Sequence, residues 1–496
     1  MSYKPSNIVA IFLAEFDVKS GYKLAWSKSS IAGFDFDGLD YKAFPSGIHE
    51  YTHSTVLLSH SVNDKLYYGL SKFYQYIIGD DSNDRNNVKM YSLGVLCEPK
   101  SNNWKPNEFI NNGWEFSGIL QEKLVNFVNS QDYTNFQTLE ELNLDLPLTT
   151  PNINHHLLTN LPEMFKILGP LVFVLYKQSL LRKNILIFNQ HHKIYDDQDI
   201  LPNDNDSLYN ITSFSYLISL LSVIPSDIDF VSKTSAPTCS QPIYNIGLND
   251  LTGSLLQLKG YIGSTSDDIL KDNHVYDIGV LIDDKSTVFR YPSQPIKASN
   301  KDYQKFQLIY QDLPTKKIGF TNNSDISTDD LNSIRTTSVQ DYPPTSLRSD
   351  FQEPEWWRNS ATEPVSWTES IWSAFAWFAT AGQQLETQVP PTIHHVQDKA
   401  DLLDLVNIIG YFHKLTKKWF YMVNELVLEA LEDQSITEEQ PLTERITIKL
   451  TYQDVAEMEL DPYSKEDLEF IKEFILLYWE IVDHVEIGMG LTSICC

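Results

Sequence analysis

The architecture of this chain follows from residues 165–188, which have the sequence FKILGPLVFVLYKQSLLRKNILIF. Gly169-Pro170 is typical of a helix start, because proline at the first helical position loses no needed hydrogen bond. Almost every side chain from Leu171 to Leu181 is apolar, so we expect this helix to be covered on most sides. The run from Ile185 to Phe188 has the length of a buried strand. The stretch predicts a helix and a strand at the core of an α/β domain.

Three cations belong to this stretch. Arg182 and Lys183 fall in the expected last turn of the helix, where positive charge favours the negative end of the helix dipole. Cations are few in this chain, with 38 Lys and Arg against 66 Asp and Glu, so a contact with a partner is the alternative for Lys177, Arg182 and Lys183. For Arg182 and Lys183 we favour the helix-end interpretation.

Composition limits the class of protein. A chain of 496 residues is too long for one compact core, so two or three domains are expected. The net charge of -28 repels phosphate backbones, which argues against a nucleic-acid partner. Four cysteines form no disulfide framework, and no signal-peptide layout or long apolar run is present. We therefore expect a cytoplasmic protein.

The N-terminal part, residues 1–130, has the pattern of an antiparallel α+β domain. Strand patterns joined by turn residues are followed, after Gly113, by one amphipathic helix. The expected strands cover residues 8–14, 22–26, 51–58, 65–70 and 89–96. Residues 131–163 are polar and proline-punctuated, which indicates a linker with helical pieces.

Two further regions complete the predicted domain organisation. Residues 164–320 alternate strand patterns with helical spacing, which favours a largely parallel sheet in a central α/β domain. Residues 321–350 are rich in Ser, Thr, Asn, Asp and Pro and are expected to form a flexible insert. Residues 351–496 are predicted to be helical, with an aromatic helix over 367–382, a long helix over 398–431, and capping boxes beginning at Thr451 and Ser464.

No motif specifies a nucleophile, a phosphate loop or a zinc site. Three His-His pairs, at 155-156, 191-192 and 394-395, invite a metal interpretation, but adjacent side chains face apart in helices and strands. Asp267-Asp268 and Asp283-Asp284 have the composition of paired carboxylates, and polar loop ends explain them as well. We predict no catalytic residue, no metal site and no cofactor.

The chain ends in two thiols, Cys495 and Cys496. Two lipid chains would anchor a protein stably where one would not, so both cysteines are lipidation candidates. The ending is no C-a-a-X box, and prenylation of a Cys-Cys end needs a GTPase body, so palmitoylation is favoured over prenylation. Unmodified thiols are the alternative.

Several segments in a shared order resemble one family. Ile8–Asp17 with Gly21 and Trp26 resembles the first hairpin of the longin-like half of a DENN module. The 165–188 stretch is similar to the start of the central DENN region. The resemblance continues through residues 242–247, 250–251, 260–270, 276–277 and 460–467. Within the family, the chain is similar to the LCHN-like proteins and their fungal Avl-nine-related relatives.

The resemblance implies a bilobal fold of mixed α+β and α/β class. It comprises a longin-like antiparallel sheet with a helix, a central α/β domain and a helical C-terminal region. It also implies a Rab-type guanine nucleotide exchange factor in vesicle traffic, whose partner is a small GTPase of the Rab or Arf class. The alternative is a non-catalytic GTPase-binding or coat-binding adaptor, held by its lipidated tail. Either protein would be cytoplasmic or peripheral on Golgi, endosomal or plasma membranes.

Overall fold

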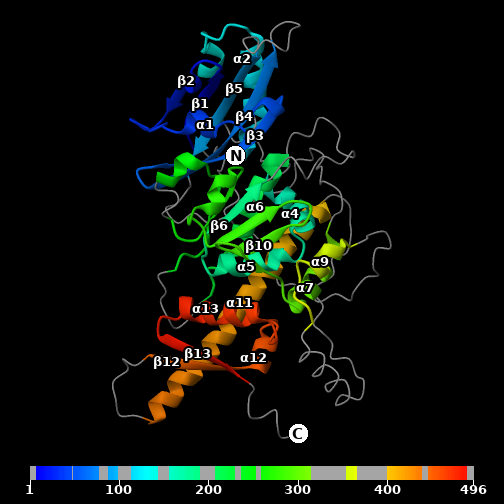
Figure 1. Ribbon diagram of the computed structural model, residues 1–496. Coiled ribbons are helices and arrows are strands. Elements are labelled where there is room, and N and C mark those ends of the chain that lie inside the picture. The colour runs from blue at the N-terminus through cyan, green and yellow to red at the C-terminus, as the bar shows by residue number, and fades with distance from the viewer. Residues whose placement is uncertain are drawn as a thin grey trace.

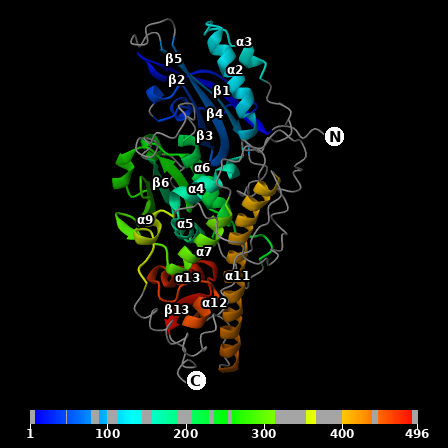
Figure 2. The same cartoon turned by 90° about the vertical axis from the view of Figure 1, so that its right-hand side faces the viewer.

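The computed structural model describes residues 7–46, 48–77, 88–98, 113–142, 156–189, 207–228, 236–252, 258–313, 353–365, 399–437 and 445–488. Three regions follow one another along an elongated molecule: a blue N-terminal domain, a green central domain and an orange-red C-terminal region (Figures 1 and 2). The insert at 321–350 and the aromatic stretch at 367–382 lie outside the described residues.

The N-terminal domain is a five-stranded antiparallel sheet in the order β2-β1-β5-β4-β3, as predicted. The helix α2 (Ser117–Asn129) covers one face through Leu120, Leu124 and Phe127. A second apolar cluster, which includes residues of α1 (Leu39–Lys42), covers the other face. The strands are β1 (Ile8–Asp17), β2 (Gly21–Ser29), β3 (His53–Val62), β4 (Lys65–Ile77) and β5 (Val88–Cys97).

The central domain contains a six-stranded mixed sheet in the order β11-β10-β9-β6-β8-β7. The strands β6 (Ile185–Asn189), β7 (Gln241–Asn245), β8 (Tyr261–Thr265) and β9 (Ile278–Ile282) are parallel, as their helical spacing predicts. An antiparallel hairpin of β10 (Thr287–Arg290) and β11 (Gln294–Ile296) extends the sheet beyond β9. The helices are α4 (Leu161–Leu168), α5 (Leu171–Leu180), α6 (Ser207–Leu221), α7 (Asn300–Asp312) and α9 (Glu355–Asn359).

The helix α5 is the centre of this domain, and all ten of its residues are buried. Pro170 immediately precedes it with helical backbone angles, as the sequence predicts. Gly169 separates α4 from α5 with a φ of +56°, and a Cβ there would lie 2.5 Å from the ring of Trp357. Glycine is therefore required at this turn both for its backbone conformation and for the close approach of the indole.

Among the described residues of 131–163, two pieces of helix precede α4, which begins at Leu161. They are α3 (Gln137–Glu140) and the 3-10 helix η5 (Leu157–Asn160), which agrees with the expected helical pieces. Leu157 and Leu158 are fully buried, so this part of the chain contributes to the core. One apolar cluster in fact joins side chains of all three regions, although the chain length suggested separate cores.

The C-terminal region is built on the long helix α11 (Lys399–Thr437), with α12 (Tyr452–Glu457) and α13 (Lys465–Tyr478) beside it. The capping box at Thr451 is present, and Ser464 caps α13 by accepting the N–H of Asp467. The prediction of a helical region was incomplete, because β12 (Ile446–Thr451) and β13 (Val482–Gly488) form a two-stranded parallel sheet. The signal was present in β12, where buried Ile446, Ile448 and Leu450 alternate with exposed side chains.

Among the described residues, no single helix is long and apolar enough to cross a membrane. One consecutive pair, Leu157–Leu168 with Leu171–Leu180, meets the length and composition test together but is bent by 116°.

Candidate functional site

The N-terminal domain lies directly against the central domain (Figures 1 and 2). Contacts of Asn245 and Ser266 place this junction near the carboxyl ends of β7 and β8. Each of these strands is followed by a short 3-10 helix, η7 (Leu248–Thr252) after β7 and η9 (Asp268–Asp272) after β8. Parallel sheets of α/β proteins present their binding loops at this edge, because the loops that follow the strands gather there. The junction is therefore the first place to look for a binding surface.

Specific polar contacts join the two domains at the junction. Lys42 Nζ of α1 lies 2.5 Å from Asp250 Oδ1 of η7, and the two side chains are only 9% and 7% exposed. The hydroxyl of Ser266 donates to Ser46 Oγ at 2.7 Å. The Asn245 amide donates to the carbonyl of Leu57 at 3.2 Å. These contacts hold α1 and β3 against the ends of β7 and β8, so the junction presents one continuous surface.

Large apolar side chains are exposed on both sides of these contacts. Ile269 in η9 is 63% exposed and Leu248 in η7 is 41% exposed. Across the junction, the 40% exposed ring of Tyr22 lies 5.2 Å from Phe44, two residues before Ser46. Exposed apolar groups gathered around a domain boundary are typical of a protein-interaction surface. We call Tyr22, Ser46, Leu248, Ser266, Asp267 and Ile269 the junction surface.

Carboxylates surround the apolar groups of the junction surface. Asp267 Oδ2 accepts the N–H of Leu248 at 3.3 Å and so ties the loop after β7 to the loop after β8. Asp268 is largely exposed and lies 2.8 Å from Lys271. Asp17 ends β1, and hydrogen bonds from Ser20 and Lys19 lower its pKa to about 2, so it is ionised at neutral pH. An apolar centre bordered by charged groups suits a partner that presents apolar side chains and complementary charges.

The Asp-Asp pairs at 267-268 and 283-284 serve as loop ends. Asp267 and Asp268 have the different partners just described and do not form a joint carboxylate site. In the β9–β10 turn, Asp283 Oδ1 accepts the N–H of Asp284 at 3.0 Å. Across the part of the chain that the structure describes, no group of three or more His, Cys, Asp or Glu could hold a metal ion.

Of the three His-His pairs, only His156 is described. Its Nδ1 accepts the N–H of Leu158 at 3.0 Å at the start of η5, and burial lowers its pKa to about 3. It is therefore a neutral cap of a 3-10 helix. His155, His191, His192, His394 and His395 lie outside the described residues.

Lys177 lies in the interior, between the central domain and the C-terminal region. Its side chain is 6% exposed, and Nζ lies 2.5 Å from Asp302 Oδ2 of α7 and also pairs with Asp467 of α13. Burial alone would lower the pKa of Lys177, but Asp302 and Asp467 outweigh it and raise the pKa above its ordinary value. The amine is committed to two buried carboxylates, so it is not available to a partner on the surface.

Arg182 follows α5 with a φ of +55°, and its guanidinium donates to the carbonyls of Ser179 and Pro237. It thus binds the carbonyl end of α5, in line with the favoured interpretation. Lys183 lies 2.6 Å from Glu473 of α13, and its side chain remains 34% exposed. The contacts of Arg182 and Lys183, like those of Lys177, lie within the chain.

The lipidation candidates Cys495 and Cys496 lie outside the described residues. The other two cysteines, Cys97 and Cys239, are buried, and burial raises the pKa of Cys97 well above its usual range. Neither of these two is placed for surface chemistry.

Sequence reasoning missed the junction surface. Its polar contacts join residues such as Lys42 and Asp250, which no local pattern connects. The only available signal was Ile269, an apolar residue that follows two aspartates in a predicted loop.

Comparisons with known proteins cover nearly all of the chain. The family model described as DENN domain-containing protein 11 matches residues 11–149 and 143–292, which include both domains of the junction. A model described as "Domain of unknown function (DUF4484)" matches residues 390–495. The uncharacterized protein ANR2 of Saccharomyces cerevisiae is 24% identical over 534 aligned positions, covering 99% of this chain and 95% of the relative. An uncharacterized protein of Schizosaccharomyces pombe is 26% identical over 343 positions, covering 61% and 71% respectively.

Proposed function

Because the chain belongs to the DENN domain-containing protein 11 family, we propose that it regulates a small GTPase as a Rab-type guanine nucleotide exchange factor in vesicle traffic. The observation that carries this proposal is the junction surface. It exposes apolar side chains from both of the domains that the family model spans.

Nucleotide exchange of this kind needs no general base. The exchange factor binds the nucleotide-free GTPase more tightly than the loaded form, and this difference in binding free energy drives nucleotide release. Shifting a two-state equilibrium from 1:99 to 99:1 needs about 5.5 kcal/mol of differential binding. Contacts to Ile269, Leu248 and Tyr22 would contribute to this difference only to the extent that they form in the complex with the nucleotide-free GTPase and not with the loaded one. Charged groups beside them would mainly speed the encounter with a partner of complementary charge.

The proposal is tested by release of labelled GDP from a panel of purified Rab and Arf GTPases. We expect the full-length chain to accelerate release from at least one of them. Leu248→Asp should reduce this acceleration tenfold or more. The substitution replaces an apolar side chain of the junction surface with a second carboxylate beside Asp267, and burying that charge in the complex is unfavourable. Leu428→Asp is the matched control, since Leu428 on α11 is 42% exposed and lies outside the junction.

Binding without acceleration would instead support the adaptor alternative. Equal loss of activity in Leu248→Asp and Leu428→Asp would show that the junction surface is not the GTPase site. Absence of both binding and acceleration across the panel would contradict the proposed function.

Membrane attachment through Cys495 and Cys496 belongs to the same proposal. A lipidated tail would hold the factor at the surface of a Golgi, endosomal or plasma membrane, where lipid-anchored GTPases act. Intact-mass measurement of the protein from its native cytosol and membrane fractions tests this directly, because each palmitoyl or prenyl group adds a defined mass. Unmodified cysteines in both fractions would rule the lipid anchor out.

A further inference from the structure

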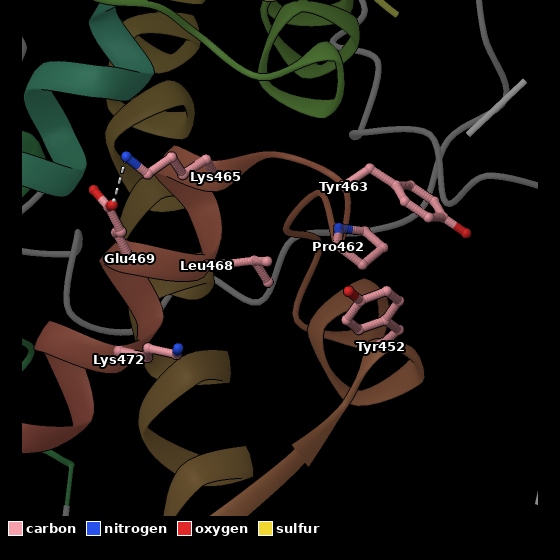
Figure 3. Close-up of a pocket in the computed structure, with 7 residues that line it drawn as sticks. All are labelled: Tyr452, Pro462, Tyr463, Lys465, Leu468, Glu469 and Lys472. Carbon is pink, nitrogen blue, oxygen red and sulfur yellow. Dashed lines mark ion pairs between the residues drawn. The ribbon is translucent and has the colours of Figure 1, made fainter. Parts of the chain in front are cut away.

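A pocket of about 400 Å³ opens in the C-terminal region between α12 and α13 (Figure 3). Its apolar wall consists of Tyr452, Pro462, Tyr463 and Leu468. The rings of Tyr452 and Tyr463 are edge to face at 5.9 Å, and Figure 3 shows the Leu468 side chain reaching toward Tyr452 and Pro462. A volume in this range accommodates a small ligand or a few apolar side chains.

The opposite side of the pocket is formed by the solvent-facing surface of α13. Lys465 and Glu469 pair across one helical turn at 3.2 Å, and Lys472 lies one turn further along. With Lys465 and Lys472 against Glu469, this side carries one net positive charge and disfavours basic groups, while the opposite wall favours apolar ones.

The chain leaves its last described strand directly beside this pocket. The strands β12 and β13 are parallel, and Gly488 at the end of β13 is in register with Thr451 at the end of β12. Paired strands are about 4.8 Å apart, and the next residue after Thr451 is Tyr452 of the pocket wall. Residues 489–496 therefore begin about one strand spacing from the apolar wall.

The composition of residues 489–496 matches the pocket. Their sequence, MGLTSICC, has no charged side chain, although 21% of the chain is charged. Met489, Leu491 and Ile494 are apolar, and the two cysteines follow. Fully extended, such a segment reaches about 25 Å, which is ample for a pocket that begins beside its first residue.

We propose that residues 489–496 dock in the α12–α13 pocket and that the docked state withholds Cys495 and Cys496 from modification. A tethered segment of this length has an effective concentration of about 1 mM, so an intrinsic dissociation constant of about 0.1 mM keeps it docked about nine-tenths of the time. So weak a contact is readily displaced, which makes the thiols accessible on demand. The inference does not depend on the exchange activity, because the pocket lies apart from the junction surface.

Disulfide trapping in the full-length chain tests the docking. Lys472→Cys places a thiol on the pocket side of α13, while Gln453→Cys places one on exposed α12, next to Tyr452 but outside the lining. Under mild oxidation we expect Lys472→Cys to form an intramolecular disulfide with Cys495 or Cys496 at least tenfold faster than Gln453→Cys. Equal rates would overturn the proposal, because an undocked tail would encounter both thiols alike.

Thiol reactivity gives a second readout that needs no trapping. Since Cys97 and Cys239 are buried, a thiol reagent reports on Cys495 and Cys496. Leu468→Ser, which weakens the apolar wall, should speed their modification severalfold, up to the roughly tenfold that complete release from a nine-tenths docked state allows. The same rate in the original chain and in Leu468→Ser, or a disulfide yield that rises with protein concentration because a second copy supplies the tail, would contradict intramolecular docking.

Discussion

The central domain has two interfaces of opposite character. Against the N-terminal domain, the buried ionic contact is the pair of Lys42 and Asp250, and the neighbouring contacts are neutral hydrogen bonds and apolar packing. Against the C-terminal region, cations of the central domain meet a series of carboxylates on α13. These pairs are Lys177 with Asp467, Lys183 with Glu473, and Arg290 with Glu466 and Glu469.

The difference distinguishes a candidate binding surface from an interface that holds the fold together. At the C-terminal interface, Lys177, Lys183 and Arg290 each form an ion pair with a carboxylate of the same chain. At the N-terminal junction, apolar side chains and carboxylates remain exposed around the contacts. The junction surface still exposes apolar side chains that a partner could cover, whereas the charged groups of the C-terminal interface are already paired. The junction surface is therefore better suited to binding a partner.

The largest expected effect is that of Lys177→Met. Asp302 and Asp467 have fully buried side chains and would lose their shared cation, so the free energy of unfolding should fall by about 4 kcal/mol. Urea denaturation measures this change. Asp302→Asn and Asp467→Asn added to Lys177→Met should restore most of the stability, because asparagine removes the charge and keeps an oxygen that can accept the backbone N–H of Ser299 or Asp461. A loss below about 1 kcal/mol in the single variant would contradict the buried cluster.

At the other interface, Lys42→Met should cost about 2 to 3 kcal/mol. The effect is smaller because the Asp250 side chain is 7% exposed, whereas those of Asp302 and Asp467 are fully buried, and because Asp250 still accepts the N–H of Gly247 at 3.0 Å. Urea denaturation measures the loss of global stability, and limited proteolysis of the native protein detects local opening. We expect cleavage between the two domains to increase before global unfolding does. Unchanged proteolysis would show that the ion pair does not hold the domains together.

The pH dependence of the C-terminal interface should depend on Glu363. Burial raises its pKa from 4.5 to about 7, and Asp467 and Glu466 add to the effect. The folded protein then binds the Glu363 proton between about pH 4.5 and 7 while the unfolded chain releases it, so this group makes stability fall as the pH rises through that window. Glu363→Gln should raise stability by about 1 kcal/mol at pH 8, allowing for partial exposure, and change little at pH 4. If the stability of Glu363→Gln changes with pH in the same way as that of the original chain, Glu363 is not the group responsible.

The smallest expected effect is that of Lys183→Ala. Lys183 and Glu473 lie 2.6 Å apart but are 34% and 45% exposed, so the pair should contribute no more than about 0.5 kcal/mol. Thermal unfolding in low and high salt checks this, because solvent screens such a pair. A loss comparable with that of Lys177→Met would mean that exposure does not distinguish the two lysines.

Local features of the fold were predictable from short segments. The apolar run of α5, the turn at Gly169-Pro170 and the capping box of Thr451 and Asp454 each form within a few residues, and their signals are correspondingly local. The alternation of Ile446, Ile448 and Leu450 is an equally local signal of a strand. The strand has only six residues and lies between helices, so its pattern was assigned to the surrounding helical region.

The candidate site could not be predicted in this way. Ile269 and Leu248 have apolar side chains typical of a core, and only the tertiary structure shows that neither the central domain nor its neighbours cover them. Tyr22 joins them through contacts between residues 220 positions apart, such as Ser46 and Ser266.

Lys177 shows where local inference ends. Its place in an apolar helix is evident from neighbouring residues, which is why the helix was expected to be covered on most sides. Its partners, Asp302 and Asp467, are 125 and 290 residues away in the sequence. Only the packing of these distant helices decides that the amine pairs with two buried carboxylates and not with a partner at the surface. Helix and strand patterns are encoded in side chains that are neighbours in the chain. Burial and charge pairing are set by contacts between segments far apart, because desolvation and Coulombic attraction act through space and not along the backbone.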